Sequence, residues 1–245
     1  MKTPDFWAAL PLGRGVTVLA RDENGLAALL KPAGVLSHPN APGDEPRSVV
    51  VAAYRLDDEC YEVGGERLWL LNRLDSATSG VILAAADEHL AMQIREQFRR
   101  KEVRKTYAAL VFGVPRQAAE LWRDRLAVVR RGGQVRASAG GGMPAECRMT
   151  LLKAGAGQPR VSLLRLEPMT GRSHQLRVQC ARRKLPIVGD QTYGNFAANR
   201  DFAKLAGTKR MFLHSLETAF DYTFLGRTHS FAAGAPLPLE FERFS

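Results

Sequence analysis

Short apolar runs, each bounded by turn residues, dominate the hydropathy pattern of the chain and predict more strands than helices. Within several runs, apolar and polar positions alternate, which is typical of a strand with one buried face. The expected strands cover residues 16–19, 26–30, 105–112, 160–167 and 211–224.

A helical period is clearest over residues 87–101, where Leu90, Ile94 and Phe98 recur at i, i+4 and i+8. Asp87 can accept a hydrogen bond from the first turn and so cap this helix. The pattern therefore predicts an amphipathic helix whose other face is basic.

Two further helices and three loops complete the pattern. Ser173 can cap a helix that runs to about residue 184, and residues 48–56 fit a short helix. Proline and glycine predict a loop at 37–47, and residues 186–194 are expected to form an ordered loop. Three arginines among five glycines at 130–142 indicate a basic, flexible loop, which is either a solvated hairpin end or a phosphate contact.

These elements predict a mixed α+β fold around a largely antiparallel central sheet with flanking helices. We find no internal repeat and no clean linker. We therefore expect residues 1–15 to be a short leader and residues 16–245 to form a single domain.

Composition supports a folded protein with a polyanionic partner. The hydrophobic content is 45%, and 35 Lys and Arg against 25 Asp and Glu give a net charge of +10. RNA or DNA is the first candidate partner, although a basic surface without such a role is also common.

The cysteines and the N-terminus indicate a cytoplasmic protein with no membrane segment and no metal site. The three cysteines lie far apart, and they show no zinc-ligand spacing. No apolar run approaches 18 residues, and the N-terminus lacks the apolar region of a signal peptide.

Asp75 is the most informative residue for chemistry. It lies in the segment Asn-Arg-Leu-Asp-Ser-Ala-Thr-Ser-Gly at 72–80, between apolar runs at 68–71 and 81–83. A charged group between two strand-like runs is either held in an ion pair or placed for chemistry. The local pattern alone leaves both readings open and favours a turn aspartate beside an arginine.

Five short segments carry a family resemblance through their order and spacing. They are Lys31–Pro39, Asn72–Gly80, Arg104–Tyr107 with Gly113, Thr170–Val178 followed by Pro186–Asp190 and Tyr193-Gly194, and, more weakly, Phe212–Ser215. Together they resemble the RluA-type pseudouridine synthases over roughly residues 16–224.

The resemblance implies an enzyme that isomerises specific uridines of rRNA or tRNA to pseudouridine without any cofactor, in a catalytic domain with a central RNA-binding cleft. It implies that Asp75 acts at the ribose C1′, as nucleophile or as base. Arg177 is the expected partner that keeps this carboxylate ionised, and Tyr107 the residue that stacks on the base and can transfer a proton. Without the resemblance, Arg177 could be a phosphate contact or a solvated charge, and Tyr107 a core residue.

A second group of residues is expected at the substrate. The group implied by the resemblance, or placed by charge, comprises Asn72, Arg73, Arg172, His174 and Leu176. Further basic candidates for phosphate contacts are Arg182, Arg183, Lys184 and the 130–136 segment. The alternative for His174 is a hydrogen bond to backbone in a capping turn.

Departures from the family pattern concern RNA positioning. Asn72 stands where histidine is common, and Ser76-Ala77 replace a more polar pair. The first motif starts near residue 16, which leaves no room for a separate S4-type RNA-binding domain. We therefore expect the catalytic domain itself to select the target.

Two other functions remain open at this level. One is an RNA-binding protein on the same fold that performs no catalysis, and the other is a nucleoside N-glycoside hydrolase. The RNA and the uridine are not readable from the sequence, and a monomer is the default expectation.

Overall fold

The computed structural model describes residues 4–131 and 134–244. The chain divides into two compact units. Unit 1 comprises Met1–Arg104 and Ser215–Pro236, and unit 2 comprises Lys105–His214 and Leu237–Ser245.

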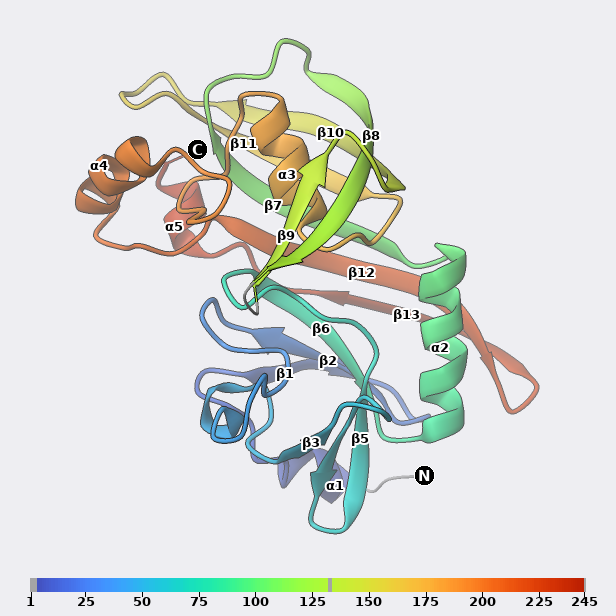
Figure 1. The fold of residues 1–245 in the computed structure, drawn as a ribbon. Helices are drawn as coiled ribbons and strands as arrows, with labels where there is room; N and C mark the ends of the chain where they lie inside the picture. The colour runs from blue at the N-terminus through green and yellow to red at the C-terminus, as the bar shows by residue number, and fades with distance from the viewer. Residues whose placement is uncertain (1–3, 132–133, 245) are drawn as a thin grey trace. The chain divides into compact units, whose positions relative to one another are not determined.

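Unit 1 is built mainly from antiparallel strands (Figure 1). β2 pairs with both β1 and β6, β6 also pairs with β5, and β5, β4 and β3 follow as a meander. β12 pairs with β13 as a hairpin. The strands of this unit are β1 (Thr17–Arg21), β2 (Leu26–Lys31), β3 (Ala53–Arg55), β4 (Cys60–Val63), β5 (Glu66–Leu70), β6 (Ser79–Ala85), most of β12 (Leu213–Phe224) and β13 (Arg227–Gly234). Its helices are α1 (Pro4–Ala8), the 3-10 helix η1 (Glu45–Arg47) and α2 (Glu88–Arg100).

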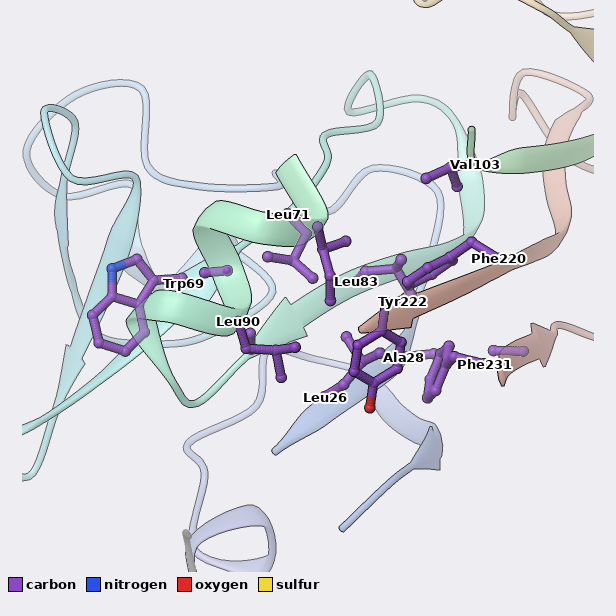
Figure 2. Close-up of a cluster of buried hydrophobic side chains, with 14 of the residues drawn as sticks. Leu26, Ala28, Trp69, Leu71, Leu83, Leu90, Val103, Phe220, Tyr222 and Phe231 are labelled. Carbon is purple, nitrogen blue, oxygen red and sulfur yellow. The ribbon is translucent and has the colours of Figure 1, made fainter. Parts of the chain in front are cut away.

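Strand β6 is buried along its whole length and apolar from Val81 to Ala85, because both of its faces are covered. Leu83 packs with Leu26, Leu90 and Phe220 in one cluster, which Figure 2 shows beneath helix α2. Ile82, on the opposite face of the same strand, belongs to a second cluster. A strand with two buried faces reads as a continuous hydrophobic run rather than an alternating one.

The second cluster also includes the N-terminal segment that we expected to be a leader. Trp7 of α1 is 5% exposed, and Leu10 is 7% exposed. Both side chains pack with Leu29 and Ile82. This segment therefore contributes to the core of unit 1.

Unit 2 contains five antiparallel strands in the order β7-β11-β10-β8-β9. They are β7 (Arg104–Phe112), β8 (Ala119–Arg131), β9 (Gln134–Ala139), β10 (Met143–Ala154) and β11 (Val161–Pro168). Helices α3 (Gln175–Arg182), α4 (Phe196–Ala206) and α5 (Leu239–Glu242) complete the unit. The expected α+β class with mainly antiparallel strands is confirmed.

The prediction of helix α2 is confirmed in detail. The Asp87 side chain accepts a hydrogen bond from Leu90 N at 2.9 Å, and Leu90 and Ile94 are fully buried. Lys101 ends the helix in the left-handed conformation, at φ 64°. The i, i+4 apolar period and the cap were sufficient to place this helix.

Three local predictions are wrong. Residues 48–56 form no helix, since residues 53–55 are strand β3 and pair with β4. Residues 134–139 of the expected flexible loop form strand β9, which pairs with β8 as a hairpin, in keeping with the hairpin alternative for this segment. In both cases pairing with a neighbouring strand outweighs local propensity. Residues 132–133 of that loop, and the side chains of Arg130, Arg131 and Arg136, lie outside the described part.

The third error concerns the start of α3. His174, not Ser173, is the N-cap residue, and it adopts a left-handed conformation with φ 55°. The predicted inward positions are confirmed, because Leu176, Cys180 and Leu185 are all buried.

No helix in the described part of the chain is long and apolar enough to cross a membrane.

Candidate functional site

The loop that carries Asp75 is held to unit 1 by a side chain before the aspartate and is closed by a backbone turn after it. Before it, Ser37 Oγ donates to Leu74 O at 2.8 Å and accepts from Leu74 N at 3.0 Å. After it, the backbone Thr78 N donates to Asp75 O at 2.9 Å and closes a turn. The Asp75 carboxylate is half-buried at the end of this fixed segment.

Lys31 also holds this loop in place. Its side chain is fully buried, and Nζ donates to the carbonyls of Ser76 at 3.0 Å and Pro32 at 3.1 Å, and to that of Val35. A buried ammonium is tolerated only with such partners. Sequence reasoning missed this role, because Lys31 was only the first residue after the expected strand at 26–30 and the first residue of a motif.

Asn72 and Gly80 fix the two ends of the segment. Asn72 Oδ1 accepts a hydrogen bond from Leu83 N at 2.8 Å, so this residue anchors the loop to β6. A Cβ on Gly80, whose φ is +113°, would lie 2.1 Å from Ser215 O. Only glycine fits this close approach.

Arg73 is exposed beside Asp75 and lies close to a histidine. Its Nη1 is 3.4 Å from His38 Nε2, and the His38 ring stacks on Tyr54 at a centroid distance of 4.7 Å. This arrangement presents a cation and a ring stack at the rim of the Asp75 loop.

Arg177 is buried in the first turn of α3 and forms a bidentate ion pair with Asp190 in unit 2. Nε donates to Oδ2 and Nη2 to Oδ1, both at 2.8 Å, and the side chains are 8% and 1% exposed. Asp190 Oδ1 also accepts from the backbone N of Thr192 and of Tyr193. Burial alone would raise the pKa of the Asp190 carboxyl, but these hydrogen bonds and the charge of Arg177 outweigh it, so this pKa lies below its ordinary value.

This pair fixes the orientation of the guanidinium. An arginine that is bound side-on through Nε and Nη2 has a second edge, formed by its two terminal nitrogens, that can bind another carboxylate. Asp190 was part of a quoted motif without any assigned role. No hydropathy period marks a loop carboxylate, so only the fold reveals it as the partner of Arg177.

Tyr193 connects Arg177 to His174. Arg177 Cζ lies 5.1 Å from the centre of the Tyr193 ring. The Tyr193 hydroxyl is 2.8 Å from His174 Nδ1 and accepts a hydrogen bond from Ala137 N at 2.7 Å. His174, in the turn that caps α3, thus contacts the Tyr193 side chain. The alternative that we considered for this residue was a hydrogen bond to backbone.

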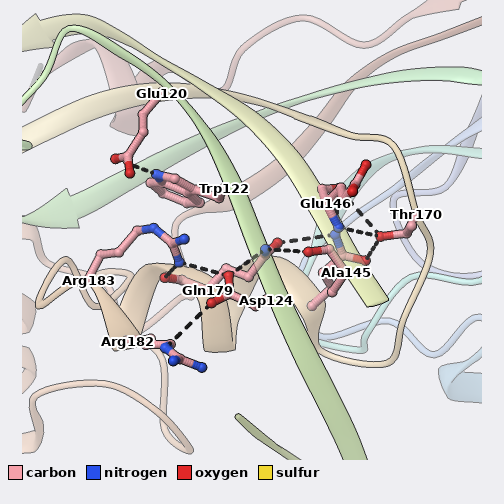
Figure 3. Close-up of polar contacts among 10 residues, drawn as sticks. Glu120, Trp122, Asp124, Ala145, Glu146, Thr170, Gln179, Arg182 and Arg183 are labelled. Atoms are coloured by element: carbon pink, nitrogen blue, oxygen red, sulfur yellow. Dashed lines mark hydrogen bonds and ion pairs between the residues drawn. The ribbon is translucent and has the colours of Figure 1, made fainter. Parts of the chain in front are cut away.

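Helix α3 is anchored to the neighbouring strands by polar contacts of its side chains (Figure 3). Asp124 of β8 accepts from Gln179 Nε2 at 2.8 Å and from Arg183 Nη1 at 2.9 Å, and it pairs with Arg182. Arg183, expected as a phosphate contact, thus holds the helix in place. Arg172 Nε donates to Pro144 O at 3.2 Å, and Leu176 is buried.

Tyr107 lies on β7 opposite Leu166 of β11 and is half-buried. Lys105 is two residues earlier and so on the same face of the strand. Burial lowers the pKa of the Lys105 ammonium. The face of β7 that carries Tyr107 therefore also carries the partly desolvated ammonium of Lys105.

The structure thus places Asn72, Arg73 and Asp75 on one loop of unit 1, and it joins Arg177 and His174 through Tyr193 in unit 2. The pairing of Asp75 with Arg177 stays a prediction. Among the described residues, no cluster of three His, Cys, Asp or Glu side chains could hold a metal ion.

Known proteins similar to this chain share one activity in their names. The RNA pseudouridylate synthase family model matches residues 25–182. The tRNA pseudouridine synthase C of Vibrio cholerae serotype O1 is 30% identical over 204 residues, which cover 80% of this chain and 81% of the relative. The Yersinia pestis protein of the same name is 30% identical over 226 residues, 88% of this chain and 85% of the relative.

A solved structure shares the fold. The human protein "RNA Pseudouridylate Synthase Domain Containing 4" superposes with a TM-score of 0.67 at 23% identity, and the match covers 97% of this chain and 93% of that one. At this identity the likeness supports the fold alone.

Proposed function

Because the chain belongs to the RNA pseudouridylate synthase family and so isomerises uridine to pseudouridine in RNA, we propose that Asp75 carries the reaction and that the substrate is tRNA. The assignment of Asp75 rests on the way in which its loop is held in place. Lys31, Ser37 and Asn72 hold that loop by hydrogen bonds, yet Asp75 itself is only half-buried. Preorganisation of this kind suits a group that must meet a reacting atom.

Asp75 acts at the ribose C1′, as nucleophile or as base. The bond from C1′ to N1 breaks, the uracil turns, and C1′ bonds to C5. The C5 hydrogen leaves as a proton and N1 gains one, so substrate and product are isomers and no redox partner is needed. The reaction uses the carboxylate as an anion, and a nearby cation would balance its charge and fix its direction.

Arg177 is that cation in our proposal. Asp190 holds the guanidinium side-on, and the edge formed by the terminal nitrogens is the one that would bind Asp75. Tyr107 stacks on the uracil and its hydroxyl takes part in the proton transfer at C5. Arg73 and Arg172 contact phosphates, His174 and Leu176 complete the surroundings of Arg177, and Asn72 anchors the loop.

The tRNA substrate is proposed from the names of the relatives, which match over most of their own length. We place the activity in the cytoplasm, since Cys60, Cys147 and Cys180 are buried thiols, as a reducing compartment favours.

Pseudouridine mapping of total RNA, from cells with and without this gene, tests the substrate. We expect one or a few tRNA positions to lose pseudouridine, and the wild-type gene but not Asp75→Asn to restore them. Lost positions confined to rRNA would refute the tRNA assignment. Equal restoration by both genes would refute the role of Asp75.

A further inference from the structure

A pocket of about 430 Å³ lies in unit 2 against helix α4, apart from the residues assigned to catalysis. Its wall combines α4 with residues of the 188–191 loop and of the 208–212 segment. This volume falls within the range of small-ligand sites, roughly 300–1,000 Å³.

The pocket is basic. Its described lining includes Arg200, Lys204, Lys209 and Arg210 and no carboxylate. Two of the four cations are balanced, because Lys204 lies 3.8 Å from Asp201 and Arg210 lies 3.8 Å from Glu240. Arg200 and Lys209 are exposed and form no ion pair with any described residue. The pocket therefore favours an anion, with two cations available to bind it.

An exposed aromatic ring stands beside these cations. Phe196 is the first residue of α4 and is 53% exposed, whereas Phe202 and Phe212, which also line the pocket, are 2% and 1% exposed. Phe196 and Arg200 are separated by one helical turn and so share a face. A ring that the core does not bury, next to a cation, is a platform on which a base can stack.

The pocket is directly connected to the loop that holds Arg177. Asn199 lines it and bonds to that loop twice, accepting from Gly189 N at 2.7 Å and donating to Asp190 O at 2.9 Å. A ligand in this pocket would therefore bind next to the segment that orients the arginine.

We propose that this pocket binds a nucleotide of the RNA substrate other than the target uridine. Its base stacks on Phe196, and its phosphate is bound by Arg200 and Lys209. This inference deepens the proposed function, since it assumes that the substrate is tRNA, and it supplies a contact that selects and positions the RNA within the catalytic chain itself.

Two variants test the proposal with an unmodified tRNA transcript as the probe. Phe196→Ala should raise the Kd, and the KM for pseudouridine formation, at least about fivefold, the lower limit expected for one stacked base. Its kcat at saturating RNA should stay within about twofold, and Phe196→Tyr should retain affinity. Arg200→Ala with Lys209→Ala should lower the slope of log Kd against log salt by about one to two units.

Two control variants separate the loss of the pocket from a general change in α4 and from a change in net charge. Leu205→Ala removes another exposed apolar side chain, 51% exposed, about half a turn from Phe196 around the axis of α4. Lys153→Ala removes an exposed cation on β10. Both controls should bind like the wild type.

The proposal is overturned if Phe196→Ala binds the transcript as tightly as the wild type does, or if Leu205→Ala loses as much affinity. A kcat loss without a change of KM or Kd would also overturn it. Binding does not depend on turnover, so a wild-type protein that binds but does not modify tRNA would refute the proposed substrate while the Kd comparison still tests the pocket.

Discussion

Replacing Asp190 with alanine removes the carboxylate that holds Arg177, and it leaves a guanidinium that is 8% exposed without that partner. Two charge-assisted hydrogen bonds of 2.8 Å are lost, and the backbone N–H groups of Thr192 and Tyr193 lose an acceptor. Removing one partner of a buried ion pair costs about 3–5 kcal/mol. For a chain of this size, that loss corresponds to a fall in Tm of about 6–20 °C.

Denaturation in urea, followed by circular dichroism, measures this loss. Asp201→Ala is the matched control, because Asp201 and Lys204 form an ion pair on the surface, 77% and 83% exposed. Exposed pairs contribute about 0–1 kcal/mol, so this variant should unfold almost like the wild type.

A double-mutant cycle gives the sharper comparison. Arg177→Met with Asp190→Ala removes both charges, so the combined loss should be smaller than the sum of the two single losses by at least about 2 kcal/mol. If Asp190→Ala costs less than about 1 kcal/mol, or if the single losses add, Asp190 does not hold Arg177 as described and the proposed orientation fails.

Three other changes test separate parts of the account. Tyr107→Phe should slow single-turnover chemistry by about 100-fold or more while the Kd for tRNA stays unchanged, since the ring still stacks; normal chemistry with weakened binding would contradict the role of the hydroxyl. Lys31→Met removes one donor from each of three carbonyls, of which Ser76 O still accepts from Gly34 N, and it should lower both the free energy of unfolding, by about 2–3 kcal/mol, and kcat; unchanged kcat would show that the Asp75 loop does not need this anchor. Burial raises the pKa of the Cys147 thiol to about 12. The unfolded state loses this proton above the ordinary thiol pKa near 8.5, whereas the folded state retains it. The free energy of unfolding should therefore fall as the pH rises from about 8.5 toward 12. Cys147→Ala should flatten that alkaline decline in urea titrations at pH 7 and pH 10, and an equal decline in both proteins would refute this source of pH dependence.

The sequence predicted elements whose signals are local. The period of Leu90 and Ile94 with the Asp87 cap placed α2, and the apolar, strand-like run at 81–83 lies within β6. Strands β3 and β9 were missed because their structure depends on pairing with other strands, which neither segment encodes alone.

The candidate site shows the same division. Asp75, Tyr107 and Arg177 were proposed from motifs, whereas the residues that hold Asp75 and Arg177 in place were not predicted. Lys31 was missed because lysine is rarely fully buried, and the role of Asp190 depends on a contact between a loop and a helix. A residue that positions another one carries no sequence signal for that role, because the role depends on a contact formed only in the fold.

Release of tritium from tRNA transcripts labelled at C5 of uridine tests the central claim most directly, because forming the new bond to C5 expels that hydrogen. We expect the wild-type protein to release tritium from one or a few uridines per transcript, and Asp75→Asn to release none above background while binding the same RNA. Release by Asp75→Asn at the wild-type rate would contradict the assignment of Asp75 as the carboxylate that carries the reaction.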